Sequence, residues 1–202
     1  MWLARVLILA SFLLSFSLSA SGWFEQFPVG ALFAFGTFAI ASGYLILHWL
    51  SERFRLFVQA RNLKRLTQSQ AFRFFGTLAL VKAWQHTLPL AFAVPTGIAD
   101  LIIAIGSFFI APLVPDRGPV PKAFFIWHFA GLATLAMSAA LAILTSSPRF
   151  GLIDGGVTSQ AMTAFPVSIV PTFIGPMVTI FHLLALDAAR HRNRHYGLSG
   201  RM

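Results

Sequence analysis

A few ionisable side chains stand inside the apolar stretches of this chain, where each needs a physical reason to be kept. A charge at the middle of a membrane helix costs about 2.5 kcal/mol or more, and such groups are typical of proton, ion or ligand pathways. The residues that qualify are Lys82, His86, Asp100, His128, His182 and His48. They are the first candidates for chemistry in this sequence.

Lys82, His86 and Asp100 belong to two successive apolar stretches that Pro95-Thr96-Gly97 is expected to separate by a turn. This turn predicts Asp100 near the outer face, Lys82 near the midplane and His86 between them. A ladder of these three side chains would suit proton or anion passage. In the alternative interpretation, Asp100 steadies the turn and Lys82 extends toward the interface or meets a backbone carbonyl.

His48, His128 and His182 all fall near the inner ends of their stretches, about 3 to 9 Å from the cytoplasmic edge at 1.5 Å of rise per residue. Three imidazoles at similar depth could ligate a metal, and His128 and His182 could hold a haem b. The alternative is that each ring lies near an interface and meets water or a carbonyl.

The last apolar stretch carries prolines at every fifth position, Pro166, Pro171 and Pro176. Each proline removes an amide donor and frees the carbonyl four residues earlier, and broken helices with free carbonyls form many transport sites. Ser168 and Thr172 are four residues apart and share a face, so they are candidates for a polar strip beside those carbonyls. A kinked packing helix is the alternative.

Composition indicates which elements must position these groups. The chain has 202 residues, of which 57% are hydrophobic and 10% charged, whereas soluble domains carry about 25% charged residues. The length suits a single bundle surrounded by lipid. The absence of cysteine excludes disulfides, thiolate metal sites and cysteine nucleophiles. The net charge of +9 is interpreted as membrane topology, and nucleic acid is not an expected partner.

The predicted fold is an all-α bundle of six transmembrane helices in one domain, residues 1–202. The spans are expected at about 3–20, 30–50, 74–94, 98–114, 123–145 and 164–186. The first ends in Ser19-Ala20-Ser21-Gly22, so it is either a cleaved signal peptide or an uncleaved span, and its length favours the uncleaved span.

Basic residues connect these spans on one side. Residues 51–73 predict an amphipathic interfacial helix whose cations, from Arg53 to Arg73, attract anionic lipid headgroups; a solvated loop is the alternative. Residues 187–202 form a basic tail. Six spans place every Lys and Arg except Lys82 and Arg149 on the inner side. We therefore expect a bacterial inner-membrane protein with both termini in the cytoplasm.

Several short motifs resemble a pattern of small, uncharacterised bacterial multi-pass membrane proteins. They are Phe72-Arg73-Phe74-Phe75-Gly76, Leu88 to Asp100, Trp127 with Gly131, and Phe165-Pro166 through Pro171, Pro176 and His182. The likeness covers about residues 70–190. In that pattern Asn commonly follows the Trp and Asp follows the Gly by a few residues, where this chain has His128 and Thr134. The resemblance implies the fold and no activity.

The first functional hypothesis is a transporter or channel for a small solute, an ion or protons. The alternatives are a haem-b redox subunit that uses His128 and His182, and a non-catalytic membrane partner or assembly protein that acts as a homo-oligomer or in a membrane complex. An enzyme is less expected, because the six acidic residues form no paired motif and no nucleophile signature is present.

Overall fold

The computed structural model describes residues 2–147 and 156–199, and these residues contain helices and no strand. Four of the helical runs are long and apolar enough to cross a membrane: Val29–Leu50, Leu90–Leu113, Lys122–Leu144 and Val170–Gly197. The predicted all-α class and its membrane-length apolar helices are therefore confirmed. Large apolar side chains such as Phe35, Phe109 and Ile126 remain about 70% exposed, as expected where lipid rather than water surrounds the bundle.

The first part of the chain, up to Gln59, forms an apolar helix, a broken helix and a short amphipathic one. In order these elements are α1 (Trp2–Ala20), the 3-10 turn η1 (Trp23–Gln26), α2 (Val29–Ala34), the π-helical η2 (Phe35–Ala39), α3 (Ile40–Leu50) and α4 (Glu52–Gln59).

The rest of the chain begins with one continuous helical run of three parts. These are α5 (Leu63–Gln68), the 3-10 segment η3 (Ser69–Thr77) and α6 (Leu78–Trp84). Then follow α7 (Leu90–Ile110), the 3-10 turn η4 (Ala111–Leu113), α8 (Lys122–Leu144), the 3-10 turn η6 (Ser159–Thr163), the π-helical η7 (Val170–Ile174) and α9 (Gly175–Ser199).

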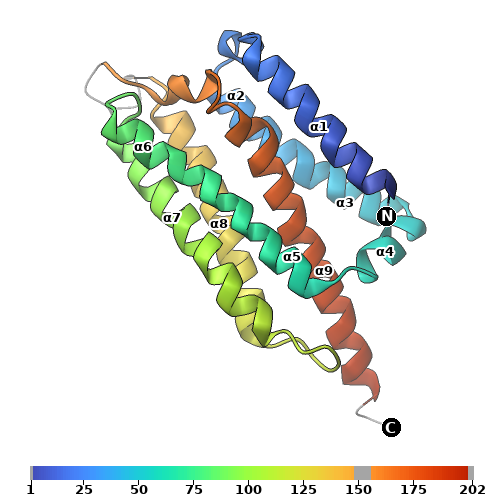
Figure 1. Ribbon diagram of the computed structural model, residues 1–202. Helices are drawn as coiled ribbons and strands as arrows, with labels where there is room; N and C mark the ends of the chain where they lie inside the picture. The colour runs from blue at the N-terminus through green and yellow to red at the C-terminus, as the bar shows by residue number, and fades with distance from the viewer. Residues whose placement is uncertain (1, 148–155, 200–202) are drawn as a thin grey trace.

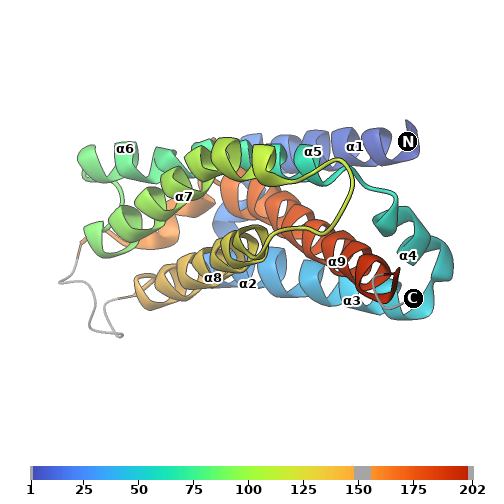
Figure 2. The ribbon, with the colours of Figure 1, turned by 90° about the horizontal axis from the view of Figure 1, so that it is seen from below.

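Helix α9 is the central element of the bundle. It contacts α3, α4, α5, α8 and η3. In Figure 1 it descends through the middle of the molecule toward the C-terminus, and Figure 2 shows it between a layer containing α1, α5 and α6 and a layer containing α2, α3 and α8. More than half of the apolar part of the run Val170–Gly197, which includes α9, is buried, the largest share among the four membrane-length runs. Polar side chains that α9 carries inward are consequently shielded from lipid.

The hairpin formed by α6 and α7 reverses direction earlier in the chain than the sequence predicts, since α6 ends at Trp84, ten residues before the expected end at residue 94. Pro95 is inside α7, which begins at Leu90, and the expected turn at Pro95-Thr96-Gly97 is wrong. The chain reverses instead between Trp84 and Leu90, and Pro89 is the residue that precedes α7. Pro95 is the sixth residue of α7, so it removes one intrahelical hydrogen bond, to the Ala91 carbonyl. Membrane helices tolerate such a loss where neighbouring groups satisfy the freed carbonyl.

A specific capping motif ends α6. The Thr87 amide donates to the Lys82 carbonyl at 2.9 Å, and the His86 amide donates to the Ala83 carbonyl at 2.9 Å. His86 has φ 55°, so the two bonds and the left-handed residue form a Schellman motif. Glycine usually occupies this position; here it is histidine, and the sequence therefore lacks the usual signal for the helix end.

The shifted hairpin exchanges the depths of the charged residues. Asp100 lies halfway along α7, about 15 Å from its first residue at 1.5 Å per residue, while Lys82 stands two residues before the end of α6. His86 is exposed at the turn. The predicted ladder of Lys82, His86 and Asp100 is therefore wrong, because the first two residues belong to the hairpin end and the third to the middle of the bundle.

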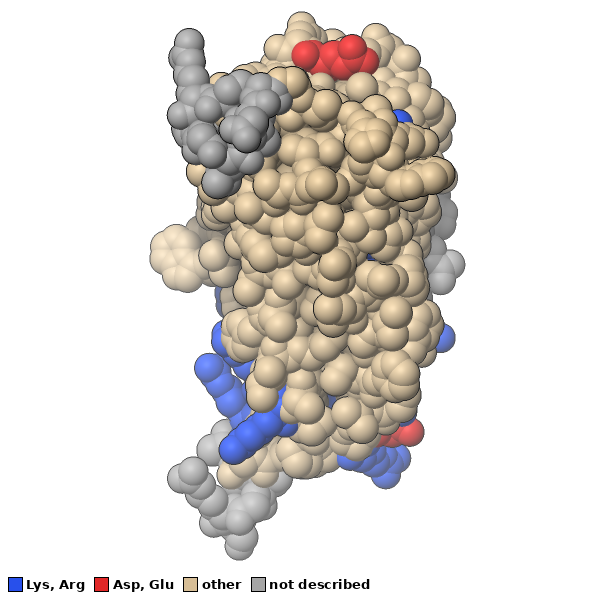
Figure 3. All heavy atoms as spheres, turned by 90° about the vertical axis from the view of Figure 1, so that its left-hand side faces the viewer, with Lys and Arg blue, Asp and Glu red and all other residues tan. Residues whose placement is uncertain are grey.

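The basic segment 51–73 also divides differently from the prediction. Only α4 is a separate short helix, whereas the run that begins at Leu63 enters the bundle and buries Thr67, Gln70 and Arg73. The other cations of this segment, Arg53, Arg55, Arg61, Lys64 and Arg65, lie in or beside α4 and α5. Figure 3 shows most of the Lys and Arg on the face it presents toward one end, a broad uncharged surface beyond them, and acidic side chains at the opposite end. Arg149 and Arg201 lie outside the described residues.

Candidate functional site

The 3-10 segment η3 aligns three unusual residues on one face of its helix. Gln70, Arg73 and Gly76 are spaced three apart, and each is buried. A 3-10 helix has 3.0 residues per turn, so residues at this spacing eclipse one another. The face points into the bundle toward α7 and α9, which η3 contacts. This local geometry brings a guanidinium into the interior.

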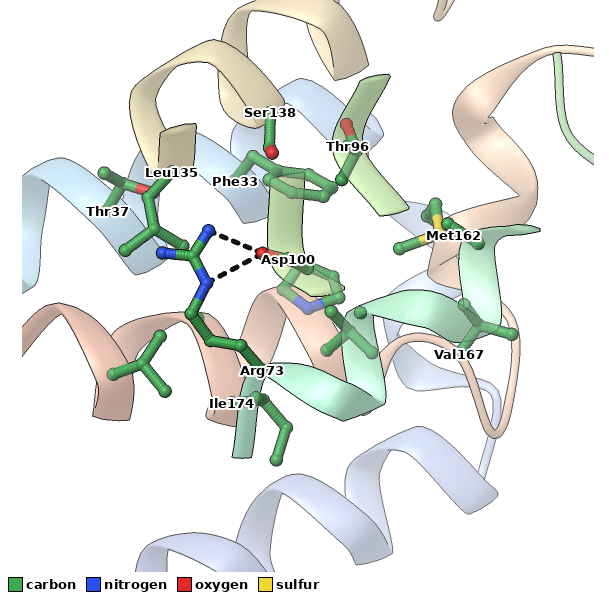
Figure 4. A pocket seen from close by; sticks show the side chains of 16 residues that line it. Phe33, Thr37, Arg73, Thr96, Asp100, Leu135, Ser138, Met162, Val167 and Ile174 are labelled. Atoms are coloured by element: carbon green, nitrogen blue, oxygen red, sulfur yellow. Dashed lines mark hydrogen bonds and ion pairs between the residues drawn. The ribbon is translucent and has the colours of Figure 1, made fainter. Parts of the chain in front are cut away.

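Arg73 is 1% exposed and forms a buried ion pair with Asp100 of α7. Its Nε donates to Asp100 Oδ1 at 2.8 Å and its Nη2 donates to the same oxygen at 2.5 Å. On α8, the Gly131 carbonyl accepts from Nη1 and the Thr134 hydroxyl accepts from Nη2, both at 2.8 Å. Figure 4 shows the two side chains meeting from different helices. Such a network is what a buried charge requires.

Two glycines make the close approach of these helices possible. A Cβ at Gly76 would collide with the Asp100 carboxylate, and a Cβ at Gly131 would collide with the His182 ring. Both residues lie in helices, where glycine costs stability relative to alanine. The cost is offset by the approach of a carboxylate in one case and an imidazole in the other.

A small cavity of about 40 Å³ lies beside the ion pair. Its polar lining comes from Thr37, Thr96 and Ser138 in addition to the pair itself. The Thr96 hydroxyl has no hydrogen-bond partner among the described residues, and a cavity of this size is large enough for water. The site therefore offers a small, mostly apolar space with a few polar groups next to a buried charge pair.

Two π-helical segments border this cavity. Thr37 belongs to η2, and Val170, Pro171 and Ile174 belong to η7. A Cβ at Gly36 would lie 2.5 Å from the Pro171 carbonyl, so the two segments cross closely. Single π-helical turns are rare and occur frequently at functional sites. The proline-broken stretch contributes to the cavity through Pro171.

Ser168 and Thr172 face a different neighbour from the one the sequence suggests. The Ser15 and Thr172 hydroxyls are 2.7 Å apart, and Ser19 and Ser168 are also hydrogen-bonded. These contacts fasten α1 to the broken segment. Neither Ser168 nor Thr172 lines the cavity, and Pro176 does not line it either. The expected polar strip is thus a helix-packing contact.

A histidine pair lies next to the ion pair. His128 of α8 and His182 of α9 are fully buried, and their Nδ1 atoms are 2.8 Å apart. His128 Nε2 is 3.3 Å from the Thr67 hydroxyl, which itself donates to the Leu63 carbonyl at 2.9 Å. The two histidines, for which the sequence suggests a similar depth, are thus in direct contact in the structure.

The hydrogen bonds assign the protons of this pair. Because the Thr67 hydrogen is directed to a carbonyl, His128 Nε2 must be the donor to Thr67 Oγ1. A neutral His128 then accepts at Nδ1 from His182. His182 Nε2 is left as a bare, buried acceptor with no partner among the described residues. Neighbouring Gly131 connects it to Arg73 through the carbonyl that the guanidinium binds.

This geometry limits the metal and haem interpretations. A haem iron holds two axial nitrogens about 4 Å apart at bonds of about 2 Å, so a haem would require the two rings to separate. His48 does not join the pair; its Nε2 lies 2.7 Å from Asp187, which also accepts from Tyr44 at 2.8 Å. Over residues 2–147 and 156–199, no group of three or more His, Cys, Asp or Glu could hold a metal ion.

Arg73 is the residue of the candidate site that the sequence did not single out. Its neighbours Arg61, Lys64 and Arg65 made it look like the last cation of a cytoplasmic segment. The available signal was the spacing of Leu63, Leu66, Thr67, Gln70, Arg73, Gly76 and Ala79, all of which are buried. That pattern predicts a helix that carries polar groups inward.

Comparison with known proteins finds one family. The model of the family called domain of unknown function (DUF8737) matches residues 27–190. This range includes the ion pair, the cavity and the histidine pair. No curated protein and no solved structure matches the chain. Residues Trp2–Ala20 of α1 lie outside the matched range.

Proposed function

The chain belongs to this family of unknown function, and from that premise we propose that it is a membrane transporter or channel for protons, ions or other small solutes. The observation that carries the proposal is the Arg73–Asp100 pair, buried at mid-bundle beside a small cavity that the unpartnered Thr96 hydroxyl also lines. Ionisable groups in the membrane interior mark ion and proton pathways.

Energetics favour a functional reason for this pair. Removing two charges from water costs several kcal/mol for each ion, and apolar residues of similar volume are often equally or more stable. The pair also borders the small cavity, which the unpartnered Thr96 hydroxyl lines. A charge pair that is costly to bury and adjoins a cavity large enough for water suits a group that handles a transported charge.

The histidine pair extends the polar route toward the basic end of the molecule. Thr67, His128 and His182 are linked by hydrogen-bond contacts, and His182 contacts the residue whose carbonyl binds Arg73. Each imidazole can accept a proton at one nitrogen while it releases one at the other. This series of side chains makes protons the favoured transported or coupling ion.

A six-span topology belongs to the same proposal. The runs Trp2–Ala20 and 63–84 would add two crossings to the four membrane-length helices. Arg53, Arg117 and Arg190 would then share one side, which the positive-inside rule assigns to the cytoplasm. Both termini would be cytoplasmic, with a bacterial inner membrane as the location and the basic tail 187–202 inside.

The test is ion flux in proteoliposomes. Purified protein is reconstituted into vesicles that contain a trapped pH dye. A potassium gradient with valinomycin sets the membrane voltage. A voltage-sensitive dye reports the movement of other ions. We expect proton or ion flux above protein-free vesicles, and loss of that flux in Asp100→Asn.

The matched variants separate loss of charge handling from loss of folding. Arg73→Gln/Asp100→Asn removes both buried charges without leaving one unpaired, so it should remain folded and lose flux. Lys64→Gln/Asp116→Asn removes an exposed pair and should retain flux. Flux in the buried double variant equal to wild type, or no flux of either kind in the wild type, would contradict the proposal; reproducible co-purification with one complex would then favour a non-catalytic partner.

A further inference from the structure

An open groove of about 420 Å³ lies at the basic end of the bundle, away from the cavity. Three parts of the chain form it: the junction between α4 and α5, the connection between α7 and α8, and the last turns of α9. Its lining includes Arg61, Lys64 and Arg192, with His191 and His195 beside them. Cations from distant parts of the sequence therefore meet in a single concave site.

One carboxylate opposes these cations. Asp116 accepts a hydrogen bond from Lys64 Nζ at 2.6 Å, and this bond holds the pKa of Asp116 below its ordinary value. The carboxylate is therefore charged at neutral pH and cancels one cation. Arg61 and Arg192 leave the groove with an excess of positive charge.

The basic groups are held in place by contacts that do not exhaust their donors. Arg192 Nη2 donates to the Pro115 carbonyl at 2.6 Å, and Arg61 Nε donates to the Phe57 carbonyl at 2.8 Å. The Arg61 guanidinium also lies 3.9 Å from the Phe57 ring centroid. A guanidinium has five N–H donors, so each arginine retains donors for an anion.

The connection between α7 and α8 is itself fixed to α9. The Asn193 side chain accepts from the Val120 amide at 2.6 Å and donates to the Val120 carbonyl at 3.1 Å. Together with the Arg192 bond, these contacts hold two walls of the groove at a constant separation. Less ordering is then required when a ligand binds.

The groove lies beside the ends of two membrane-length helical runs. Val114, which lines it, directly follows the membrane-length run Leu90–Leu113, and Lys122 begins the next run. Leu63, Val114 and Ala188 give the groove an apolar side next to its cations. Basic pockets between membrane helices on the cytoplasmic side are suited to anionic headgroups.

We propose that this groove binds the phosphate headgroup of an anionic lipid, with Arg61, Lys64 and Arg192 as the basic ligands. The position of the groove favours a lipid over free phosphate, because the groove adjoins the ends of two membrane-length runs, Leu90–Leu113 and Lys122–Leu144. This proposal does not rest on transport, and no residue that lines the groove also lines the Arg73–Asp100 cavity.

The probes are phosphatidylglycerol, phosphatidylcholine and inorganic phosphate, added to the purified full-length protein in neutral detergent. Native mass spectrometry measures the bound lipid. We expect phosphatidylglycerol to bind about tenfold or more tightly than phosphatidylcholine, and millimolar inorganic phosphate to leave that preference intact. Displacement of the lipid by millimolar phosphate would overturn the lipid assignment in favour of free phosphate.

Two charge-matched variants localise the binding. Arg61→Gln/Lys64→Gln removes cations from the groove, and Arg53→Gln/Arg65→Gln removes the same charge from exposed positions outside its lining. The first should lose the preference for phosphatidylglycerol and the second should keep it. Equal losses in both would show general attraction to a basic surface and overturn the proposal, as would a wild type with no preference.

Asp116→Asn supplies a result that mere destabilisation would not produce. Removing the opposing carboxylate should raise the affinity for phosphatidylglycerol several-fold, because Lys64 is released and one repelling charge is lost. Unchanged or weaker binding in this variant, with an unchanged unfolding temperature, would count against the groove as the binding site.

Discussion

At the scale of single residues, the interior is organised around a guanidinium that binds three neighbours. Arg73 donates to a carboxylate, a backbone carbonyl and a hydroxyl, so each of its three guanidinium nitrogens takes part in a hydrogen bond. Neither charge of the Arg73–Asp100 pair would be tolerated alone at this depth. The pair should therefore respond to substitution as a unit.

The first prediction concerns the stability of that unit. Asp100→Asn or Arg73→Gln alone should each lower the free energy of unfolding by about 3–5 kcal/mol, because one buried charge is left uncompensated. The double variant should be less destabilised than the sum of the two. Thermal unfolding in detergent measures this coupling, and strictly additive losses would contradict it. Lys64→Gln, at the exposed pair, should cost about 1 kcal/mol or less.

The second prediction concerns the helical glycines. Gly76→Ala and Gly131→Ala should each destabilise the protein by about 1–3 kcal/mol, because the added methyl group displaces Asp100 or His182. Gly43→Ala in α3 is the matched control, since no atom lies within 4 Å of its added Cβ. There alanine should be neutral or stabilising by up to about 1 kcal/mol. Equal unfolding temperatures for all three variants would refute the close approach.

At the scale of elements, two irregular segments decide where the polar groups lie. The 3-10 segment η3 aligns Gln70, Arg73 and Gly76, and the Schellman motif at His86 ends α6 before Pro89. An ideal α-helix through 69–77 would rotate these three residues off a common face. The site thus depends on helix irregularities as well as on residue types.

The third prediction tests the position of the hairpin. The chain has no cysteine, so single substitutions can be labelled without background. Gln85→Cys should react with a membrane-impermeant maleimide, because it lies exposed at the turn, and Thr96→Cys should not, because it is buried within α7. Labelling in intact proteoliposomes measures this, and the opposite pattern would restore the turn at Pro95-Thr96-Gly97.

The fourth prediction tests the histidine at the helix end. His86→Gly should leave stability unchanged or raise it by about 1 kcal/mol, because glycine adopts positive φ without strain. His86→Val should lower it by about 1–2 kcal/mol, because a β-branched residue is disfavoured there. The unfolding temperature of His86→Gly should therefore equal or exceed that of the wild type. The unfolding temperature of His86→Val should lie below it.

At the scale of the whole molecule, charge and apolar surface divide the protein into an uncharged belt and a basic end. The basic end collects residues from α4, α5 and α9, and the belt carries exposed aromatic and aliphatic side chains. This arrangement is what a lipid bilayer selects, since cations on short loops are retained in the cytoplasm.

The fifth prediction tests topology. Arg53→Cys and Arg194→Cys should be labelled from one side of the membrane, and Glu25→Cys and Gln85→Cys from the other, if six spans are present. Impermeant labelling of inside-out and right-side-out vesicles distinguishes the two sides. Labelling of Gln85→Cys from the same side as Arg53→Cys would show that the run 63–84 does not cross.

The sequence by itself determined the all-helical class and the membrane-length apolar runs, because composition and hydropathy are properties of local stretches. It also indicated that Asp100, His128 and His182 needed partners, since buried polar groups are costly wherever they lie. It placed the histidines close enough in depth for their observed contact.

Only the tertiary structure decided which partner each group has. Arg73 looks cytoplasmic in sequence and is buried, because the packing of α5, η3 and α6 against α7 and α9 sets which way its face turns. Lys82 and Asp100 exchanged depths because a histidine adopts the left-handed cap that glycine normally signals. Such pairings depend on helix rotation and on contacts between residues distant in the chain, and neither hydropathy nor spacing encodes these directly.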